Sequence, residues 1–147
     1  MTITLRNLTS DNFDECVDLE VREDQKRFVA PNVYSLAESH FRHECVTKAI
    51  YADEEMVGFL MYCYGEDYPG TLYLMRFMIG EKHQKKGYAK EAMRQLLLQM
   101  EKEFPNQSVF LSTDPDNDYA IRFYEQFGFK CTGEYADDEL IFKREAQ

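Results

Sequence analysis

The sequence lacks any apolar run that approaches the ~20 residues a helix needs to cross a bilayer. Its first residues, 1–6, also lack the apolar core of a secretory signal peptide. Internal repeats, low-complexity tracts and long linkers are absent as well. The 147 residues are enough for one domain with a full core and too few for two ordinary ones. We therefore expect a single domain over residues 1–147, located in the cytoplasm and without a membrane partner.

Cysteine is scarce, and the four cysteines (Cys16, Cys45, Cys63 and Cys131) are widely spaced without a CxxC pair. A disulfide framework or a zinc site needs closer or paired cysteines, so the sequence predicts reduced thiols. His40 and His43 lie near Cys45, but their spacing is poor for zinc and no second pair follows. We expect no metal.

Basic residues are few beside acidic ones, 17 against 27, which gives a formal net charge of −10. This balance argues against a nucleic-acid partner, because phosphate contacts need clustered Lys and Arg. An acidic surface keeps a protein soluble, and it also attracts cationic substrates. Both interpretations stay open at this point.

Hydrophobic periodicity predicts alternating helices and strands. Residues 2–8 alternate as a strand, and Ser10-Asp11 offers an N-cap for a helix through about residue 19. Ser35, followed three residues later by Glu38, resembles a capping box and predicts a second helix at 35–45. The remaining predicted elements are strands at 48–52, 56–64, 71–80, 108–113, 129–134 and 139–143, and helices at 87–103 and 119–127.

Two of these elements are informative. The strand at 71–80 is apolar nearly throughout, which is typical of a central strand covered on both faces. The helix at 87–103 carries a predicted buried stripe of Ala89, Met93, Leu96, Leu97 and Met100. The order of elements indicates a mixed α/β fold built on one central sheet.

A short basic loop, Gln84-Lys85-Lys86-Gly87-Tyr88-Ala89, joins this strand to this helix. A glycine near a helix boundary is common in ordinary turns. Here the free backbone N–H groups and dipole of the helix N-terminus, together with two lysines, favour an anion-binding site that suits a pyrophosphate.

The motif Gln84-x-x-Gly87-x-Ala89 resembles the acetyl-CoA motif Q/R-x-x-G-x-G/A of the GNAT superfamily of N-acetyltransferases. About 30 residues later, Asn117-x-x-Ala120-x-x-x-Tyr124-x-x-x-Gly128-Phe129 is similar to the N-x-x-A-x-x-x-Y-x-x-x-G-F signature of the same superfamily. The resemblance covers essentially the whole chain. It implies a mixed, mostly antiparallel sheet of about seven strands flanked by about four helices, and acetyl-CoA as cosubstrate.

The resemblance also implies roles for individual residues. Splayed strands, opening at a bulge in the central one, would hold the cofactor, and Tyr124 would act as general acid toward the CoA sulfur. The implied cofactor contacts are the backbone of Met78, Ile79 and Gly80 for pantetheine, the loop residues Gln84, Lys85, Lys86, Gly87, Tyr88 and Ala89 for pyrophosphate, and Asn117.

Segments 30–38, 57–62 and 74–79 resemble the bacterial spermine/spermidine (diamine) acetyltransferase branch, which implies a small polyamine acceptor. One position departs from that branch: Met75, which is followed by Arg76, stands where its members often carry a carboxylate. The general base therefore stays unassigned among the acidic candidates Glu20, Glu23, Asp24, Glu38 and Glu81, of which the first four are also predicted to bind the substrate.

Other functions remain open at this point. The acceptor could be a protein amine or an antibiotic, and a family member without catalysis could serve as an acyl-CoA sensor. A homodimer is expected by family analogy alone.

Overall fold

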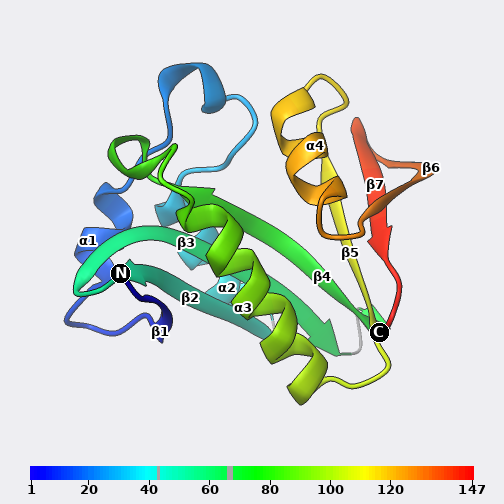
Figure 1. Cartoon of the computed structure of the whole chain (residues 1–147), viewed down its shortest axis with the longest axis horizontal. Coiled ribbons are helices and arrows are strands. Elements are labelled where there is room, and N and C mark those ends of the chain that lie inside the picture. Colours follow the sequence, from blue (N-terminus) through cyan, green and yellow to red (C-terminus); the bar gives the residue numbers. More distant parts are fainter. Residues whose placement is uncertain (43, 66–67) are drawn as a thin grey trace.

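The structure, a computed structural model, describes residues 1–42, 44–65 and 68–147. One seven-stranded sheet has the order β1-β2-β3-β4-β5-β7-β6, and its neighbours are antiparallel except for the parallel pair β4 and β5 (Figure 1). This architecture confirms the predicted fold class. The strands are β1 (Ile3–Asn7), β2 (Cys45–Ala52), β3 (Glu55–Gly65), β4 (Tyr68–Ile79), β5 (Ser108–Thr113), β6 (Lys130–Ala136) and β7 (Glu139–Arg144). The helices are α1 (Phe13–Asp18), α2 (Asn32–Phe41), α3 (Tyr88–Glu103) and α4 (Asp118–Glu125), with 3-10 turns at Glu23–Gln25 and Glu81–His83.

The two faces of the sheet are covered by different helices. α3 and α4 pack on one face over the larger apolar cluster, while α1 and α2 pack on the other over a smaller one (Figure 1). β4 lies at the centre of the sheet, as its apolar sequence predicted. Successive apolar side chains of β4 therefore reach both clusters, with Ile79 in the first and Met78 in the second.

The predicted buried stripe of α3 is largely confirmed. Met93, Leu96, Leu97 and Met100 are buried against the sheet. Ala92 is fully buried as well, whereas Ala89 is only partly buried because it lies at the helix start, beside the opening described below.

The predicted start of the second helix is wrong. α2 begins at Asn32 with Pro31 as N-cap, because the ring of Pro31 holds φ at −58° and its carbonyl accepts the amides of Tyr34 and Ser35. Ser35 is consequently inside the helix and buried, and its hydroxyl accepts a hydrogen bond from Arg76 Nε at 3.0 Å instead of capping.

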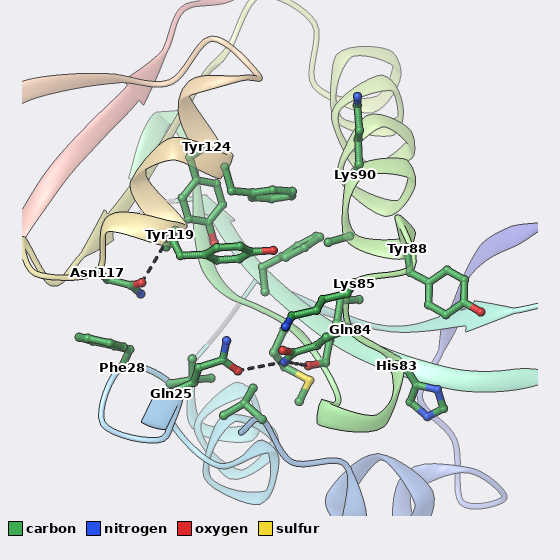
Figure 2. A pocket seen from close by; sticks show the side chains of 18 of the residues that line it. Gln25, Phe28, His83, Gln84, Lys85, Tyr88, Lys90, Asn117, Tyr119 and Tyr124 are labelled. Carbon is green, nitrogen blue, oxygen red and sulfur yellow. Dashed lines mark hydrogen bonds between the residues drawn. The ribbon is translucent and has the colours of Figure 1, made fainter. Parts of the chain in front are cut away.

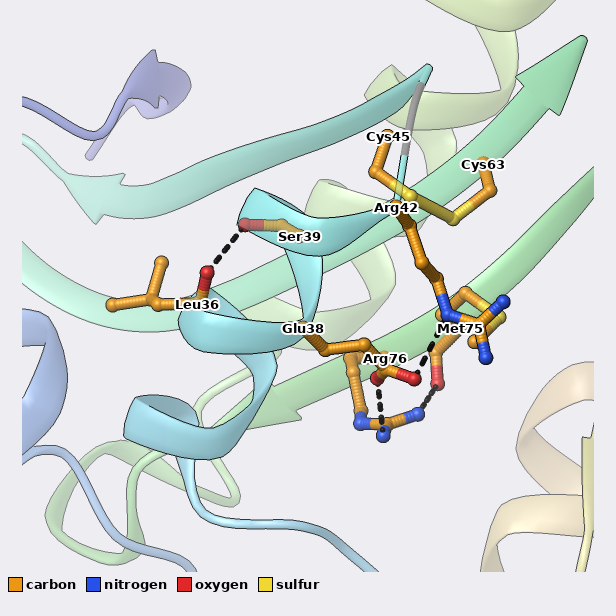
Figure 3. The surroundings of a disulfide bond; sticks show 8 residues. All are labelled: Leu36, Glu38, Ser39, Arg42, Cys45, Cys63, Met75 and Arg76. Atoms are coloured by element: carbon orange, nitrogen blue, oxygen red, sulfur yellow. Dashed lines mark hydrogen bonds and ion pairs between the residues drawn. A yellow bond between two sulfur atoms is a disulfide. The ribbon is translucent and has the colours of Figure 1, made fainter.

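The prediction of four reduced thiols is also wrong. Cys45 and Cys63 form a disulfide (Figure 3). The two residues face each other in the antiparallel pair of β2 and β3 with a Cα–Cα distance of 4.2 Å, which suits a cross-strand bridge. Their separation of 18 residues gave no local signal. Cys16 and Cys131 are free, the first buried and the second exposed.

Neither a metal cluster nor a membrane-spanning helix is found in the described part of the chain. His40 stacks edge-on against Phe41, and His43 lies outside the described residues.

Candidate active site

The sheet opens between β4 and β5. These strands pair only where Thr71 to Tyr73 lie beside Ser108 to Phe110. Further along, β4 contains a bulge: Met61 pairs with Arg76 and Tyr62 with Leu74, so Met75 is the extra residue. Among the described residues, the second half of β4 has a strand partner only in β3. Two cavities occupy the opening.

The first cavity has a volume of about 260 Å³ and lies between the end of β4, the start of α3 and α4 (Figure 2). Most of the predicted cofactor residues line it: Met78, Ile79, Gln84, Lys85, Gly87, Tyr88, Ala89 and Asn117. Gly80 and Lys86 are not part of the lining. Residues 117 and 78–79, far apart in sequence, thus meet at one cavity.

The loop at 84–87 ends at the N-terminus of α3. Gly87 is the N-cap with φ +83°, a left-handed conformation that suits glycine, and no side chain caps the helix. The amides of the first helical turn are therefore free to bind an anion, assisted by the helix dipole. Lys85 and Lys90 also line the cavity and add positive charge.

Gln84 holds this loop in place. Its side-chain amide donates to Gln25 Oε1 at 2.9 Å (Figure 2) and to the carbonyl of Ile79, also at 2.9 Å. Its oxygen accepts from Arg22 Nη1 at 3.4 Å. These bonds tie the loop to the end of β4 and to the 3-10 turn after α1. Gln84 thus positions the loop.

Tyr124 lies on α4 and lines the same cavity, with its hydroxyl directed toward it (Figure 2). Its ring packs edge-on against Phe123 and Phe129, with centroids 5.5 Å and 5.8 Å away. Burial raises the pKa of Tyr124 well above its usual range, so the hydroxyl stays protonated at neutral pH. A protonated phenol in a cavity wall is suited to donate a proton or a hydrogen bond.

Asn117 caps α4. Its Oδ1 accepts from the amide of Ala120 at 3.3 Å, which places the residue at the cavity rim at the start of the helix. Tyr119, which is 73% exposed, lies beside it in the lining.

A second cavity of about 450 Å³ adjoins the first. Both linings contain Phe28, Val29, Phe77, Asn117, Ala120 and Tyr124. The cavities therefore meet at Tyr124, and two ligands could approach each other there from opposite sides.

Four of the predicted acidic residues bind cationic side chains. Glu20 and Glu23 bind Lys26 at 3.1 and 2.8 Å, and Asp24 binds Arg22 at 3.2 Å. Glu38 bridges Arg76 and Arg42 at 3.0 Å each (Figure 3). None of these four, nor Glu81, lines either cavity.

Sequence reasoning missed several lining residues. The segment after α1 contributes Val21, Gln25, Phe28 and Val29, and β7 contributes Glu139. Residues 21–29 have no periodicity, and Glu139 is one of 27 acidic residues beside a turn, so no local signal distinguished them.

The Acetyltransferase (GNAT) family matches residues 6–129. The chain belongs to this family. Within it, the chain is similar to the spermine/spermidine N(1)-acetyltransferase of Bacillus subtilis strain 168, at 31% identity over 139 residues that cover 91% of each chain.

This GNAT chain also resembles two solved structures. One is the spermidine N-acetyltransferase from Vibrio cholerae in complex with CoA and spermine, with 16% identity, a TM-score of 0.73 and 96% and 92% of the two chains covered. The other is the ribosomal-protein-S18-alanine N-acetyltransferase from Escherichia coli, with 15% identity, a TM-score of 0.74 and coverages of 99% and 95%. At these identities the two structures show a shared fold alone.

Proposed function

We propose that this chain, as one cytoplasmic domain over residues 1–147, transfers the acetyl group of acetyl-CoA to a primary amine, and that the amine is a polyamine such as spermidine or spermine. The observation that carries the transfer is that the cavity beside the N-terminus of α3 and a second cavity meet at the protonated hydroxyl of Tyr124. The polyamine is supported by the relative at 31% identity, which is named for spermine and spermidine.

Acetyl-CoA would occupy the first cavity. Its pyrophosphate would accept hydrogen bonds from the amides at 87–90, with Lys85 adding charge. Its pantetheine arm would extend along the edge of β4 at Met78 and Ile79, where no strand pairs on the β5 side among the described residues. Exposed strand-edge N–H and C=O groups suit the amides of that arm.

The acceptor must lose a proton before it can react. A primary alkylamine has a pKa near that of lysine, about 10.4, so only about one molecule in 2,500 is neutral at pH 7. The neutral nitrogen attacks the thioester carbonyl directly and forms the C–N bond. Collapse of the tetrahedral intermediate breaks the C–S bond, and Tyr124 protonates the departing thiolate.

An acceptor screen tests this proposal. Purified protein with acetyl-CoA is offered spermine, spermidine, a simple alkylamine, an aminoglycoside and an N-terminal peptide, and free CoA thiol is followed. Fastest release with the polyamines is expected. Faster thiol release with the peptide or with the aminoglycoside would instead identify the acceptor as a protein amine or as an antibiotic. If acetyl-CoA binds but no amine causes thiol release, the protein is an acyl-CoA sensor and not an enzyme.

A further inference from the structure

The second cavity contains one carboxylate among its lining residues, that of Glu139. Glu139 is the first residue of β7, directly after the turn that joins β6 to β7. It is half-buried and belongs to the same lining as Tyr124. An ammonium that enters this cavity therefore meets the anionic side chain of Glu139 as well as the hydroxyl of Tyr124.

Ser112 orients this carboxylate. Its Oγ donates to Glu139 Oε1 at 2.8 Å, across the antiparallel pair of β5 and β7. Within the part of the chain that the structure describes, this is the one hydrogen bond of the Glu139 side chain, so Oε2 retains its capacity to accept.

The cationic side chains of this cavity are largely neutralised by carboxylates outside it. Arg76 binds Glu38, and Lys26 binds Glu20 and Glu23. Arg27, which is exposed, stacks its guanidinium over the ring of Phe28 at 4.2 Å. Glu139 is thus the acidic side chain of this lining, and its charge has the sign to attract an ammonium.

We propose that Glu139 binds the reacting ammonium and acts as its general base, an inference that rests on the acetyltransferase function proposed above. Glu139 takes one proton from the ammonium and passes it to water. The neutral nitrogen then forms the C–N bond, the C–S bond breaks, and Tyr124 gives its proton to the thiolate. The phenolate regains a proton from the new amide nitrogen through water. In sum, the ammonium and acetyl-CoA yield the amide, CoA thiol and one released proton.

The test compares Glu139→Gln with Asp138→Asn, a neighbouring change at an exposed turn residue outside both cavities. Values of kcat/KM for spermidine are measured from pH 7 to 10. General bases contribute about 10²–10⁴-fold, so a loss of that size is expected for Glu139→Gln at pH 7, with the KM for acetyl-CoA unchanged.

The pH profile separates a base from a structural role. Without Glu139 the enzyme must use amine that is already neutral, and this fraction rises about tenfold per pH unit below the amine pKa of about 10.4. The deficit of Glu139→Gln should therefore shrink steadily toward pH 10. Glu139→Asp, which keeps the carboxylate, should recover part of the activity with the wild-type pH profile, and it decides the question if the glutamine variant does not fold.

Wild-type kcat/KM in Glu139→Gln, or a deficit that is equal at every pH, would overturn the role of Glu139. Either result leaves the acetyltransferase function intact, because the wild-type enzyme still releases CoA thiol. Absence of thiol release in the wild type with every amine would instead refute the proposed function itself.

Discussion

At the scale of single residues, Tyr124 occupies the point where both cavities meet, and its chemistry depends on remaining protonated. Burial raises its pKa, so it does not ionise in the range in which the enzyme would work. In the proposed reaction the hydroxyl would contribute mainly as charge forms on sulfur, late in the reaction.

Tyr124→Phe is expected to lower kcat by about 10²–10⁴-fold and to leave the KM for acetyl-CoA near the wild-type value. Steady-state thiol release at saturating amine measures both parameters. Tyr135→Phe, a change at an exposed tyrosine on β6, is the matched control and should behave as wild type. Equal kcat in Tyr124→Phe and the control would remove the phenol from the chemical step.

Gly87 combines a positive φ with free space around the position where a Cβ would lie. Gly87→Val should add about 1–2 kcal/mol of backbone strain and place a branched side chain at the opening of the anion site. Gly133→Val is a matched control for strain, because Gly133 has the same φ of +83° and equally open surroundings on β6.

Thermal-shift titration with acetyl-CoA separates strain from binding. Both variants should melt below wild type, but only Gly87→Val should lose the stabilisation that the ligand provides. Full stabilisation of Gly87→Val by acetyl-CoA would contradict binding at the 84–89 loop.

At the scale of elements, the bulge in β4 is tied to α2. Arg76 follows the bulged Met75, donates to the Met75 carbonyl at 2.9 Å and binds Glu38 of α2 (Figure 3). It also donates to the hydroxyl of Ser35 in α2. Arg76, which follows the position that departs from the polyamine-branch pattern, thus holds the bulge of β4 against α2. The carboxylate in the lining of the second cavity comes instead from Glu139 of β7.

The pair β2 and β3 is cross-linked by the Cys45–Cys63 disulfide. A disulfide between residues this far apart in sequence reduces the entropy of the unfolded chain, which raises the free energy of unfolding by roughly 3 kcal/mol. We expect the double variant Cys45→Ser/Cys63→Ser to lower the free energy of unfolding in urea by up to that amount, whereas Cys131→Ser should have little effect because Cys131 is exposed and unpaired. Equal unfolding curves for the double variant and wild type without reductant would indicate free thiols.

Thiol labelling gives an independent measurement of the same bridge. Cys131 should react readily, while burial raises the pKa of Cys16 to about 12 and keeps it an unreactive thiol in the folded state. Unfolding should release Cys16, and only reduction should release Cys45 and Cys63. Labelling of all four cysteines on unfolding alone would rule out the bridge.

At the scale of the whole molecule, the net charge of −10 creates a field that attracts cations. A polyamine gains more from this field than a monoamine because it carries several charges. We expect the ratio of kcat/KM for spermine over a simple alkylamine to be well above one at low ionic strength and to fall as salt screens the attraction. Equal values for both amines, without salt dependence, would contradict a polyamine acceptor while leaving acetyl transfer intact.

The sequence by itself determined the order of the elements, the central place of β4, and the loop and signature that predict the cofactor site and Tyr124. These features depend on residues close together in the chain, such as the step from an apolar strand through a glycine to an amphipathic helix. The predicted contacts with acetyl-CoA stay predictions, although the structure brings most of those residues to one cavity.

Only the tertiary structure decided which carboxylate lines the second cavity and which cysteines pair. The contact of Glu139 with Ser112 follows from the register of β7 on β5, and the Cys45–Cys63 bridge follows from the register of β2 on β3. The register of two paired strands is set by side-chain packing and turn geometry. Neither can be recognised from the residues next to a given position in the sequence. For that reason the acidic residues that were prominent in the sequence proved to lie outside both cavity linings, where four of them bind Arg and Lys side chains. The carboxylate that does belong to a lining, Glu139, had no signal of its own in the sequence.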